Sequence, residues 1–406
     1  MSILTGKRIL LGLTGSIAAY KAAELASRLA QGGAQVTCIL TAGAEKFVAP
    51  LTFQSVTGQP AYTDADLWGG QAHVLHVGLG HSADLMMIAP CTANTLAKLA
   101  HGQADNLLTI TALAAACPLL LAPAMDGGMW HHPATQENVR ILQERGALIA
   151  GPAEGHLASG LSGPGRMLEP AELLGQARLA LGRNGGLAGK RVVVTAGGTQ
   201  EPIDPVRLLT NRSSGKQGYA VAQAALDAGA QVTLIATPSA SALALPVGAR
   251  LVRVETAREM LAAVLGESQH ADALVMAAAV ADFSVAAAAG NKLKKRDGIP
   301  QISLELAPDI LSAVASARAE TSLPKVVVGF AAESRDLLAN AAEKLKSKSL
   351  HMLVANDISA ADAGFGVETN RVTLLFPDGR TESLPLMSKA GVAEIIIEHL
   401  AALLEH

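Results

Sequence analysis

The chain carries one structural pattern twice, in the order strand, glycine turn, helix and strand. The segment GKRILL at residues 6–11 opens the first copy and GKRVVV at residues 189–194 opens the second, and GAQVT follows at residues 33–37 and 229–233. In both copies a continuous run of leucine or β-branched residues is typical of a parallel strand buried on two faces. A chance match in an alanine-rich chain is one interpretation. The shared order and spacing of the elements favours two related doubly wound units, whether by duplication or by convergence.

The length of the chain fits this interpretation. At 406 residues it has room for two or three domains with full-sized cores. A glycine-rich loop at residues 181–188 lies between the two copies. We therefore expect one domain over residues 1–186 and a second over residues 187–406, each an α/β fold with a doubly wound parallel sheet.

Further elements are predicted inside each half. In the first, strands are expected at residues 83–89, 118–122 and 147–150, and helices at 93–100 and 106–115. In the second, strands are expected at 273–278, 325–330 and 352–355, with a helix at 337–346. Near the end, PDGR at residues 377–380 lies between apolar runs at 371–376 and 381–385, which predicts an antiparallel hairpin.

Composition argues against several classes of function. The net charge is −3 and aromatic residues make up 3% of the chain, so there is no overall attraction to a polyanion and few rings to stack on bases. The longest apolar stretch, residues 110–125, contains two prolines and is shorter than the roughly 18 residues of a membrane span. We expect no export signal at the N-terminus, and three cysteines without metal-type spacing fit free thiols in a reducing cytoplasm. We predict no nucleic-acid partner and no membrane association.

The first strand leads into a possible phosphate site. Thr14, Gly15 and Ser16 follow this strand directly and open the next helix, whose free backbone N–H groups would favour the phosphate of a mononucleotide. A glycine at such a turn can also serve only to make the turn tight. Polar residues gather after two later strands, in APCTANTLAKLAHGQADN at 89–106 and APAMDGGMW at 122–130. They mark the carboxyl edge of the sheet, where open α/β folds bind ligands.

These two segments resemble motifs of the cysteine-decarboxylase flavoproteins. Over nearly its whole length, the chain resembles the bifunctional phosphopantothenoylcysteine decarboxylase/phosphopantothenate–cysteine ligase family of coenzyme A biosynthesis. The resemblance implies a flavodoxin-like flavoprotein domain followed by a Rossmann-like ligase domain. It also implies a homo-oligomer in which flavin domains form trimers and ligase domains form dimers.

The resemblance assigns an FMN site to the first half. Asp105 and Asn106 would shape the flavin site at a subunit contact. The residues that would hold FMN are Thr14, Gly15, Ser16, Thr41, Thr92, Asn94 and Thr95.

The resemblance also makes His76 the catalytic histidine. A neutral imidazole can take the thiol proton of the substrate while flavin removes a hydride from the carbon that bears sulfur. The resulting thioaldehyde would act as the electron sink for loss of carbon dioxide. From the residues alone, His73 and His81 lie close by, and any of the three histidines could equally be a surface residue.

Asp126 departs from the family pattern. The signature P-x-M-N-x-x-M-W appears here as PAMDGGMW at residues 123–130, so a carboxylate replaces the amide thought to hold the substrate carboxylate. Two like charges at about 4 Å in an effective dielectric of about 20 cost on the order of 4 kcal/mol. Desolvation by Met125, Met129 and Trp130 would offset this repulsion by keeping Asp126 neutral.

Ser159 is the second departure, in a glycine-rich flap at residues 155–167 where the family has a proton-donating cysteine. A hydroxyl is a far weaker acid than a thiol, so return of hydride and proton to the enethiol should be slowed or lost. This half then releases an enethiol, acts on another substrate, or serves as a flavin-binding scaffold. The alternative is that both replacements are tolerated in a working decarboxylase.

The second half carries a glycine-rich motif at the same place in its pattern. Residues 195–207 follow a buried strand, and TNRSSGKQG at 210–218 leads into a helix whose N–H groups would receive an anion. A turn of glycine and serine without function is the alternative. The motif resembles the ligase signature, in which Asn211 matches the asparagine that recognises an acyl-cytidylate.

A lysine-rich segment, KLKK at residues 292–295, follows AAAVAD at 277–282. Such a segment is usually a solvated loop, but the family uses it as a mobile flap over nucleotide phosphates, with Lys292 as the key cation. Lys344 and Lys348 are four residues apart on one helix face, so both can reach one ligand. The CTP contacts implied by the resemblance are Ala277, Ala278, Asp282, Lys292, Pro308, Asp309, Ile310, Leu311, Phe330, Lys344 and Lys348.

The implied ligase reaction has two steps. The carboxylate of 4'-phosphopantothenate attacks the α-phosphorus of CTP, giving an acyl-cytidylate and pyrophosphate while Mg²⁺ screens the charge. The amine of cysteine then displaces CMP. The metal ligands are not identified. Two other hypotheses stay open for the first half: a catalytically silent flavin domain fused to an active ligase, and a binding and oligomerisation module.

Overall fold

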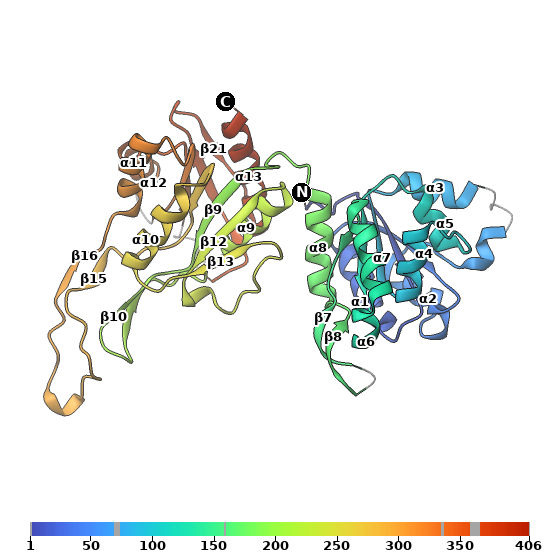
Figure 1. The fold of residues 1–406 in the computed structure, drawn as a ribbon. Helices are drawn as coiled ribbons and strands as arrows, with labels where there is room; N and C mark the ends of the chain where they lie inside the picture. Colours follow the sequence, from blue (N-terminus) through green and yellow to red (C-terminus); the bar gives the residue numbers. More distant parts are fainter. Residues whose placement is uncertain (1, 69–73, 158–159, 334–336, 358–365, 406) are drawn as a thin grey trace. The chain divides into compact units, whose positions relative to one another are not determined.

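The computed structural model describes residues 2–68, 74–157, 160–333, 337–357 and 366–405 (Figure 1). The chain divides into two compact units, Met1–Gly182 and Arg183–His406. The break between them falls inside the glycine-rich loop at residues 181–188. Among the described helices, none has both the length and the apolar character needed to cross a bilayer.

The first unit is built on a six-stranded sheet with the order β3-β2-β1-β4-β5-β6, and every neighbouring pair is parallel. The chain runs outward from β1 in one direction and then returns to add β4 on the other side, so the strand order reverses between β1 and β4. The strands are β1 Arg8–Leu13, β2 Gln35–Leu40, β3 Ala61–Tyr62, β4 Leu85–Cys91, β5 Leu119–Pro123 and β6 Leu148–Ile149.

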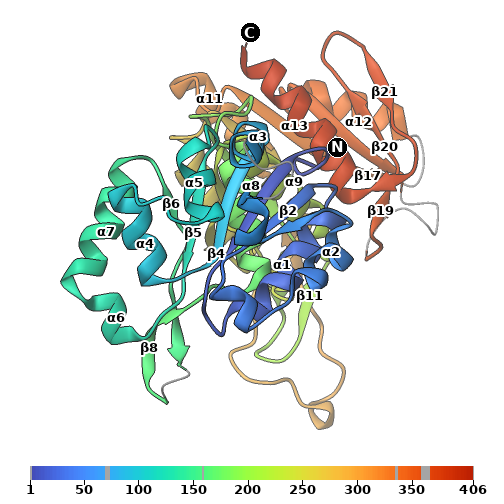
Figure 2. The same ribbon diagram turned by 90° about the vertical axis from the view of Figure 1, so that its right-hand side faces the viewer.

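Helices cover both faces of this sheet, as Figure 2 shows. Side chains alternate along β1, so that Leu11 and Leu13 belong to the core under α1, α2 and α8, whereas Leu10 belongs to the core under α4, α5 and α7. Gly12 also faces α5, where an added Cβ would lie 2.4 Å from Leu108. The helices are α1 Ala19–Gln31, α2 Pro50–Thr57, α3 Leu75–Ser82, α4 Ala93–His101, α5 Leu107–Ala114, α6 Gly127–His131, α7 Pro133–Glu144 and α8 Pro170–Gly182.

The second unit is built on an eight-stranded sheet with the order β13-β12-β9-β14-β17-β18-β20-β21. The pairs from β13 to β18 are parallel, and β20 and β21 continue the sheet antiparallel. The strands are β9 Arg191–Ala196, β12 Gln231–Ala236, β13 Arg250–Arg253, β14 Ala273–Met276, β17 Val326–Glu333, β18 Met352–Asp357, β20 Val372–Leu375 and β21 Thr381–Ser383.

Helices also lie on both faces of the second sheet (Figure 1). Helices α10 Ala257–Ser268, α11 Ile310–Thr321 and α12 Leu337–Ser347 share one buried core with the strands. Helices α9 Lys216–Asp227 and α13 Lys389–Glu405 pack against each other on the opposite face. Short 3₁₀ turns occur at Ala44–Lys46, Asp64–Trp68, Pro238–Ala240 and Lys295–Asp297.

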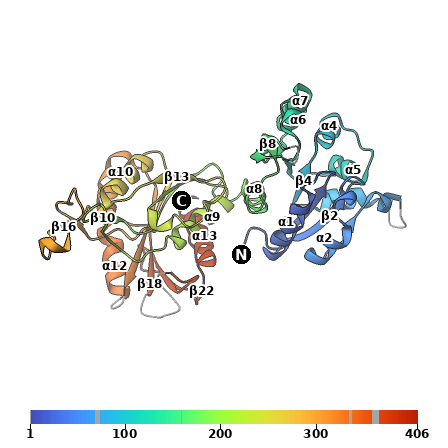
Figure 3. The same cartoon turned by 90° about the horizontal axis from the view of Figure 1, so that it is seen from below.

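Within the described residues, four antiparallel strand pairs lie outside the two large sheets. The hairpin of β15 and β16 and the long loop that joins them extend away from the rest of the second unit (Figures 1 and 3). The pairs are β7 Ala153–His156 with β8 Ser162–Arg166, β10 Gln200–Pro202 with β11 Leu208–Thr210, β15 Phe283–Val285 with β16 Leu304–Leu306, and β19 Thr369–Asn370 with β22 Met387–Ser388.

The expected fold class is confirmed, and so are the predicted elements within a few residues at their ends. The hairpin predicted around residues 377–380 is β20 with β21, where Gly379 has φ +85° and the Asp378 carboxylate accepts a hydrogen bond from the Arg380 N–H. The four small strand pairs were not predicted. Their strands are only two to five residues long, too short to show a period-two pattern.

Candidate functional site

Thr14 joins two loops at the carboxyl edge of the first sheet. Its side chain is 1% exposed, donates a hydrogen bond of 2.7 Å to the Pro90 carbonyl and accepts one of 3.1 Å from the Thr92 N–H. Thr41 likewise donates to the Leu13 carbonyl from the end of β2. These hydroxyls hold the ends of β1, β2 and β4 together, so both threonines position the loops around the site.

Gly15 and Gly43 let two of these loops touch. A Cβ added to Gly15 would lie 3.1 Å from the Gly43 Cα, and one added to Gly43 would lie 3.2 Å from the Gly15 Cα. Helix α1 begins just beyond, at an Ala18 N-cap that supplies no side-chain cap, and Ser16 accepts a hydrogen bond from the Ala18 N–H. The dipole of a helix favours a phosphate at the helix start, so these residues fit the phosphate end of FMN.

Two of the other residues expected at the flavin site are helix caps. Thr92 caps α4 through the Thr95 N–H, and Asn106 caps α5 through the Thr109 N–H. Asn94 is exposed on the first turn of α4. The Asp105 carboxylate pairs with Lys98. The hydrogen bond from that ammonium lowers the pKa of Asp105, and burial opposes this effect without cancelling it.

His76 lies on α3 and is half-buried. Its Nδ1 is buried and has no hydrogen-bond partner among the residues that the structure describes. A buried polar atom without a partner is expected at a site that a ligand completes. His81, on the same helix, is exposed, and His73 lies outside the described residues.

Asp126 caps the short helix α6 at the end of β5, and its Oδ1 accepts a hydrogen bond of 2.8 Å from the Gly128 N–H. Strand β8 passes directly over this turn, since the Met125 N–H donates to the Gly165 carbonyl and a Cβ on Gly165 would lie only 2.2 Å from the Met125 carbonyl oxygen. The glycine-rich flap therefore lies against the residues of the PAMDGGMW motif. Ser159, in the same flap, lies outside the described residues.

A cleft of about 740 Å³ lies at the carboxyl ends of the strands in the second sheet. The strand order reverses between β9 and β14, and the cleft is lined by the segments after these two strands, by β17 and β18, and by the starts of α9 and α11. Open α/β sheets bind ligands at this place. The lining contains Asn211, Ala277, Ala278, Asp282, Pro308, Asp309, Ile310, Leu311, Phe330, Lys344 and Lys348.

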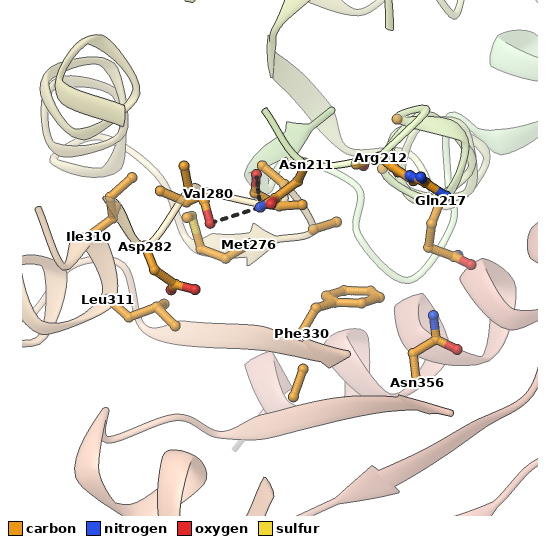
Figure 4. A pocket seen from close by; sticks show the side chains of 18 of the residues that line it. Asn211, Arg212, Gln217, Met276, Val280, Asp282, Ile310, Leu311, Phe330 and Asn356 are labelled. Atoms are coloured by element: carbon orange, nitrogen blue, oxygen red, sulfur yellow. Dashed lines mark hydrogen bonds between the residues drawn. The ribbon is translucent and has the colours of Figure 1, made fainter. Parts of the chain in front are cut away.

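The wall that follows β14 is held in place by hydroxyl groups of the neighbouring segment. The Thr195 side chain accepts a hydrogen bond from the Ala278 N–H, and the Thr199 side chain accepts one from the Ala281 N–H. The amide nitrogen of Asn211 donates to the carbonyls of Ala279 and Val280, as the dashed lines in Figure 4 show. Because these bonds use the NH₂ group of Asn211, its carbonyl oxygen is the atom that can accept from a ligand.

Lys344, on α12, and Lys348, the residue after the end of α12, both line the cleft. Lys344 Nζ donates to the Phe330 carbonyl at 2.9 Å, and Lys348 pairs with the Asp309 carboxylate and contacts the Ser312 hydroxyl. Burial opposes ionisation of Asp309, but its bonds with Lys348 and Ser312 outweigh burial and lower the pKa of Asp309. Asp309 also caps α11.

Lys292 is exposed and is not among the residues that line the cleft. The next residue, Leu293, is held by the turn between β10 and β11: its N–H donates to the buried Asp204 carboxylate at 3.1 Å, and its carbonyl accepts from Arg207 at 3.2 Å. Ala289 donates to the Ile203 carbonyl in the same region. These contacts fix the lysine segment against the β10–β11 turn.

The structure adds cleft residues that the sequence analysis did not identify: Arg212, Lys216, Gln217, Asn356, Asn370 and Lys389. Lys216 and Gln217 fall inside the glycine-rich motif, so the sequence did contain a signal that they belong to the site. Lys389 and Asn370 come from α13 and β19, far along the chain, and no local pattern marks them. Within the described residues there is no group of three or more histidine, cysteine or carboxylate side chains that could hold a metal ion.

The two halves match different protein families. Residues 2–177 match the flavoprotein family, and residues 187–404 match the family described as the DNA/pantothenate metabolism flavoprotein C-terminal domain. Together, the fold and these matches define a two-unit α/β protein with a flavoprotein unit followed by a pantothenate-metabolism unit.

The chain is also similar to characterised proteins over its full length. It is 43% identical to the coenzyme A biosynthesis bifunctional protein CoaBC of Bacillus subtilis (strain 168), across 99% of this chain and 98% of that protein. It is 44% identical to the CoaBC of Mycobacterium tuberculosis (strain ATCC 25618 / H37Rv), across 98% of this chain and 97% of that protein. The chain belongs to the family of CoaBC proteins, which are bifunctional enzymes of coenzyme A biosynthesis.

Two solved structures each resemble one half of the chain. A crystal structure of the C-terminal domain of a CoaBC protein is 38% identical, covers 54% of this chain and 98% of that chain, and has a TM-score of 0.46. A mutant PPC decarboxylase complexed with pantothenoylaminoethenethiol is 37% identical, covers 43% of this chain and 97% of that chain, and has a TM-score of 0.41. The family assignment rests on the full-length sequence matches.

Proposed function

We propose that residues 187–406 ligate 4'-phosphopantothenate to cysteine with consumption of CTP, and that residues 1–186 bind FMN and decarboxylate the product. The observation that carries the ligase assignment is the cleft at the strand-order reversal of the second sheet, which is lined by ten of the eleven residues expected to contact CTP. The remaining one is Lys292, whose neighbour Leu293 donates a hydrogen bond to Asp204 in the β10–β11 turn.

The ligase chemistry requires positive charge and fixed donors around a phosphorus centre. A carboxylate oxygen of phosphopantothenate forms a bond to the α-phosphorus of CTP, and pyrophosphate leaves. The cysteine nitrogen then bonds to the acyl carbon, loses a proton, and CMP leaves. Lys344 and Lys348 would exchange their present partners, the Phe330 carbonyl and the Asp309 carboxylate, for nucleotide oxygens, and Asn211 would offer its amide oxygen to the acyl-cytidylate.

Mg²⁺ is proposed to enter with CTP. The carboxylates in the cleft lining are Asp282 and Asp309, and Asp309 is already paired with Lys348. Magnesium at nucleotide sites keeps several waters and binds through phosphates with one or two carboxylates. Two aspartates are enough for a magnesium ion that phosphates and waters also bind, but they are too few for a site made of protein ligands alone.

The first unit is proposed to be a phosphopantothenoylcysteine decarboxylase. FMN, when bound, would supply the acceptor for a hydride from the substrate carbon that bears sulfur. The Gly15–Gly43 contact and the uncapped start of α1 fit its phosphate, and His76 has a buried ring nitrogen without a partner in the described structure. His76 would take the thiol proton, because an imidazole titrates close to neutral pH.

A second hypothesis for the first unit is a flavin-binding domain that is silent, altered in substrate, or arrested at the enethiol. It is favoured by Asp126, whose carboxylate caps a helix N-terminus, an environment that favours a negative charge. The same charge would repel a substrate carboxylate. This hypothesis leaves the ligase proposal unchanged.

One experiment separates these possibilities. Purified protein with phosphopantothenate, cysteine, CTP, Mg²⁺ and FMN is allowed to react, and the products are weighed by mass spectrometry. Phosphopantothenoylcysteine alone shows a silent first unit, loss of carbon dioxide and two hydrogens shows an enethiol, and loss of carbon dioxide alone shows a complete decarboxylase. If CTP is not consumed, the ligase proposal is wrong.

The setting of these reactions is also proposed. The substrates are small molecules, so neither nucleic acid nor a membrane is required, and the cytoplasm is the compartment in which CTP and reduced cysteine are both expected. A homo-oligomer, with trimeric flavin units and dimeric ligase units, is the assembly we expect. Sedimentation of the purified chain would test it.

A further inference from the structure

The β7–β8 hairpin of the first unit is a two-stranded pair that lies outside the six-stranded sheet. It extends from the amino end of α8, beside α6 (Figure 1). A hairpin of two strands has little stability of its own, so contacts with the rest of the unit set its place. One such contact is the hydrogen bond of 3.0 Å that the Gly165 carbonyl accepts from the Met125 N–H. A second set of contacts lies at the base of the hairpin.

Glu169 is the centre of this second set. Its Oε1 accepts a hydrogen bond of 2.6 Å from Lys21 Nζ on α1 and one of 3.0 Å from Arg166 Nη2 at the end of β8. The hydrogen bond from Lys21 lowers the pKa of Glu169, burial opposes it, and the charges of Lys21 and Arg166 lower the pKa further. One carboxylate therefore joins a helix that packs on the main sheet to the hairpin.

The backbone of Glu169 is fixed independently of these ion pairs. Its N–H donates to the Glu172 carboxylate at 2.9 Å, and its carbonyl accepts a hydrogen bond of 3.0 Å from the Leu173 N–H at the start of α8. Leu173 is fully buried in the core. The Glu169 carboxylate is therefore presented from a rigid point of the unit and is not needed to cap α8.

Arg166 extends the connection to both strands of the hairpin. It lies opposite Ala153 in the β7–β8 pair, and its side chain lies across Gly155 of β7. A Cβ added to Gly155 would lie only 2.8 Å from Arg166 Cδ and 2.8 Å from Nη1, so a glycine leaves the room that the arginine side chain occupies. Because Arg166 packs on β7 and also reaches Glu169, the position of that carboxylate bears on both strands.

Lys21 holds the other end of the connection. It lies in the first turn of α1, and its side chain is 13% exposed. A cation in the first turn opposes the helix dipole, and an ammonium shielded from water needs a partner. The Glu169 carboxylate meets both requirements. An ion pair between two exposed side chains contributes little, but this pair is screened less because its lysine is mostly buried.

We propose that Glu169 is a positioning residue for decarboxylation, which acts through Lys21 and Arg166 to set the place of the β7–β8 hairpin over the PAMDGGMW turn. The hairpin is thereby tied to α1, the helix that begins just beyond the loop proposed to hold the FMN phosphate. The inference rests on the proposed decarboxylase function for the reaction that is affected.

Hydrogen exchange of individual amides measures the place of the hairpin without turnover. In the full-length protein near neutral pH, Glu169→Ala should quicken exchange of the Met125 N–H about three- to tenfold, because its acceptor on β8 is no longer held in place. The Leu157 N–H donates to the Leu161 carbonyl inside the hairpin at 2.8 Å, and it should exchange at the wild-type rate. Equal quickening of both amides would show that the hairpin melts as a whole, and would overturn the positioning role.

Glu24→Ala is the matched control. Glu24 lies on α1, its side chain is 54% exposed against 52% for Glu169, and it pairs with Arg28 at 2.7 Å. This ion pair does not involve the hairpin, so E24A should leave both amides unchanged. A Met125 N–H that exchanges equally fast in E24A and E169A would contradict the proposal.

A double-mutant cycle tests whether Lys21 acts through Glu169. Lys21→Met keeps most of the apolar stem and removes the charge. K21M and the double variant K21M/E169A should each quicken Met125 N–H exchange by about the same factor as E169A, since each breaks the same link. Two effects that multiply in the double variant would overturn the proposal. So would a K21M protein that binds FMN tenfold more weakly while Met125 exchange is unchanged, because Lys21 would then serve the cofactor instead.

The effect on the reaction is measured as carbon dioxide release from phosphopantothenoylcysteine with FMN present. E169A should lower kcat/KM about three- to tenfold while FMN affinity stays within about twofold of wild type. Glu169→Gln keeps an acceptor oxygen for Lys21 and Arg166, so it should recover part of the lost rate. A wild-type rate in E169A would overturn the positioning role.

The two proposals fail in different ways. If the wild-type protein releases no carbon dioxide, the decarboxylase function is wrong, and the exchange rates of the Met125 and Leu157 amides still decide whether Glu169 sets the place of the hairpin. If the wild type is active and E169A leaves both amides unchanged, the positioning role is wrong and the decarboxylase function stands.

Discussion

Asp126 has a structural role in addition to the electrostatic cost proposed for it. It caps α6 through the Gly128 N–H, and asparagine caps a helix about as well as aspartate does. The two residues therefore differ at this position mainly in charge.

Replacing Asp126 by Asn should improve decarboxylation without changing stability. Removing the carboxylate relieves repulsion of the substrate carboxylate, and we expect kcat/KM for phosphopantothenoylcysteine to rise about tenfold or more. Release of carbon dioxide measures the rate, and thermal unfolding should give an unchanged Tm. An unchanged kcat/KM would show that the charge of Asp126 does not face the substrate.

His76 is the residue on which the decarboxylase proposal depends. Replacing it by Asn should lower decarboxylation about 100-fold or more, because a general acid–base group is lost. Ligation measured as CMP release should stay within about twofold of wild type. His81→Asn, on the same helix but exposed, is the matched control, and an equal loss in both variants would contradict a specific role for His76.

Strand β8 depends on a glycine at residue 165. Gly165 and Gly163 have similar φ values, +148° and +157°, but a Cβ at Gly165 would meet the Met125 carbonyl at 2.2 Å, whereas one at Gly163 would meet nothing within 4 Å. The contact, and not the backbone angle alone, distinguishes the two positions.

Gly165→Ala should displace the flap from the PAMDGGMW turn. We expect a loss of about 1–3 kcal/mol in the stability of the first unit, together with a drop in decarboxylation, while ligation is unchanged. Gly163→Ala should cost clearly less in both measurements. Chemical denaturation and carbon dioxide release test this, and equal effects of the two substitutions would contradict the contact as the cause.

The lysine segment is anchored by Asp204, whose side chain is fully buried in the β10–β11 turn. Burial opposes its ionisation, but N–H donors from Val206, Leu293 and Arg207 and the charge of Arg207 outweigh burial and lower the pKa of Asp204. A carboxyl group with a lowered pKa stabilises the fold above its unfolded pKa, and this stabilisation is lost as pH falls through the folded pKa.

Asp204→Asn should free the segment that carries Lys292. We expect hydrogen exchange of the Leu293 N–H near neutral pH to quicken about tenfold or more, because the acceptor loses its charge. The stability difference between wild type and variant should shrink when pH is lowered to about 3. A difference that stays constant with pH would show that the charge of Asp204 is not what holds the turn.

At the level of the complete chain, each unit has its own sheet and its own buried cores. Residues 1–182 and 183–406 produced as separate chains should therefore each unfold in one cooperative transition. The second should retain ligation, and the first should take up FMN with a flavin absorption spectrum. Loss of ligation in a folded 183–406 chain would contradict the assignment of that activity to the second unit.

Local sequence determined most of the fold. Continuous apolar runs such as the one in β9, the glycine turns after β1 and β9, and the Asp-Gly turn between β20 and β21 are all encoded within a few neighbouring residues. Backbone periodicity and turn chemistry act over that same range. The positions of the cleft walls could be predicted from these strands, because parallel strands place their carboxyl ends at one edge of the sheet.

Tertiary structure alone decided the contacts between distant segments. Three contacts depend on how separate elements pack. Lys389 and Asn370 line the cleft with Lys216, Asp204 accepts a hydrogen bond from Leu293, and Gly165 lies against Met125. No neighbouring residue carries a signal for such contacts, since each arises from burial and hydrogen bonding across the folded unit. The sequence determined which strands end at the site, and the packing of the helices and hairpins decided which side chains meet there.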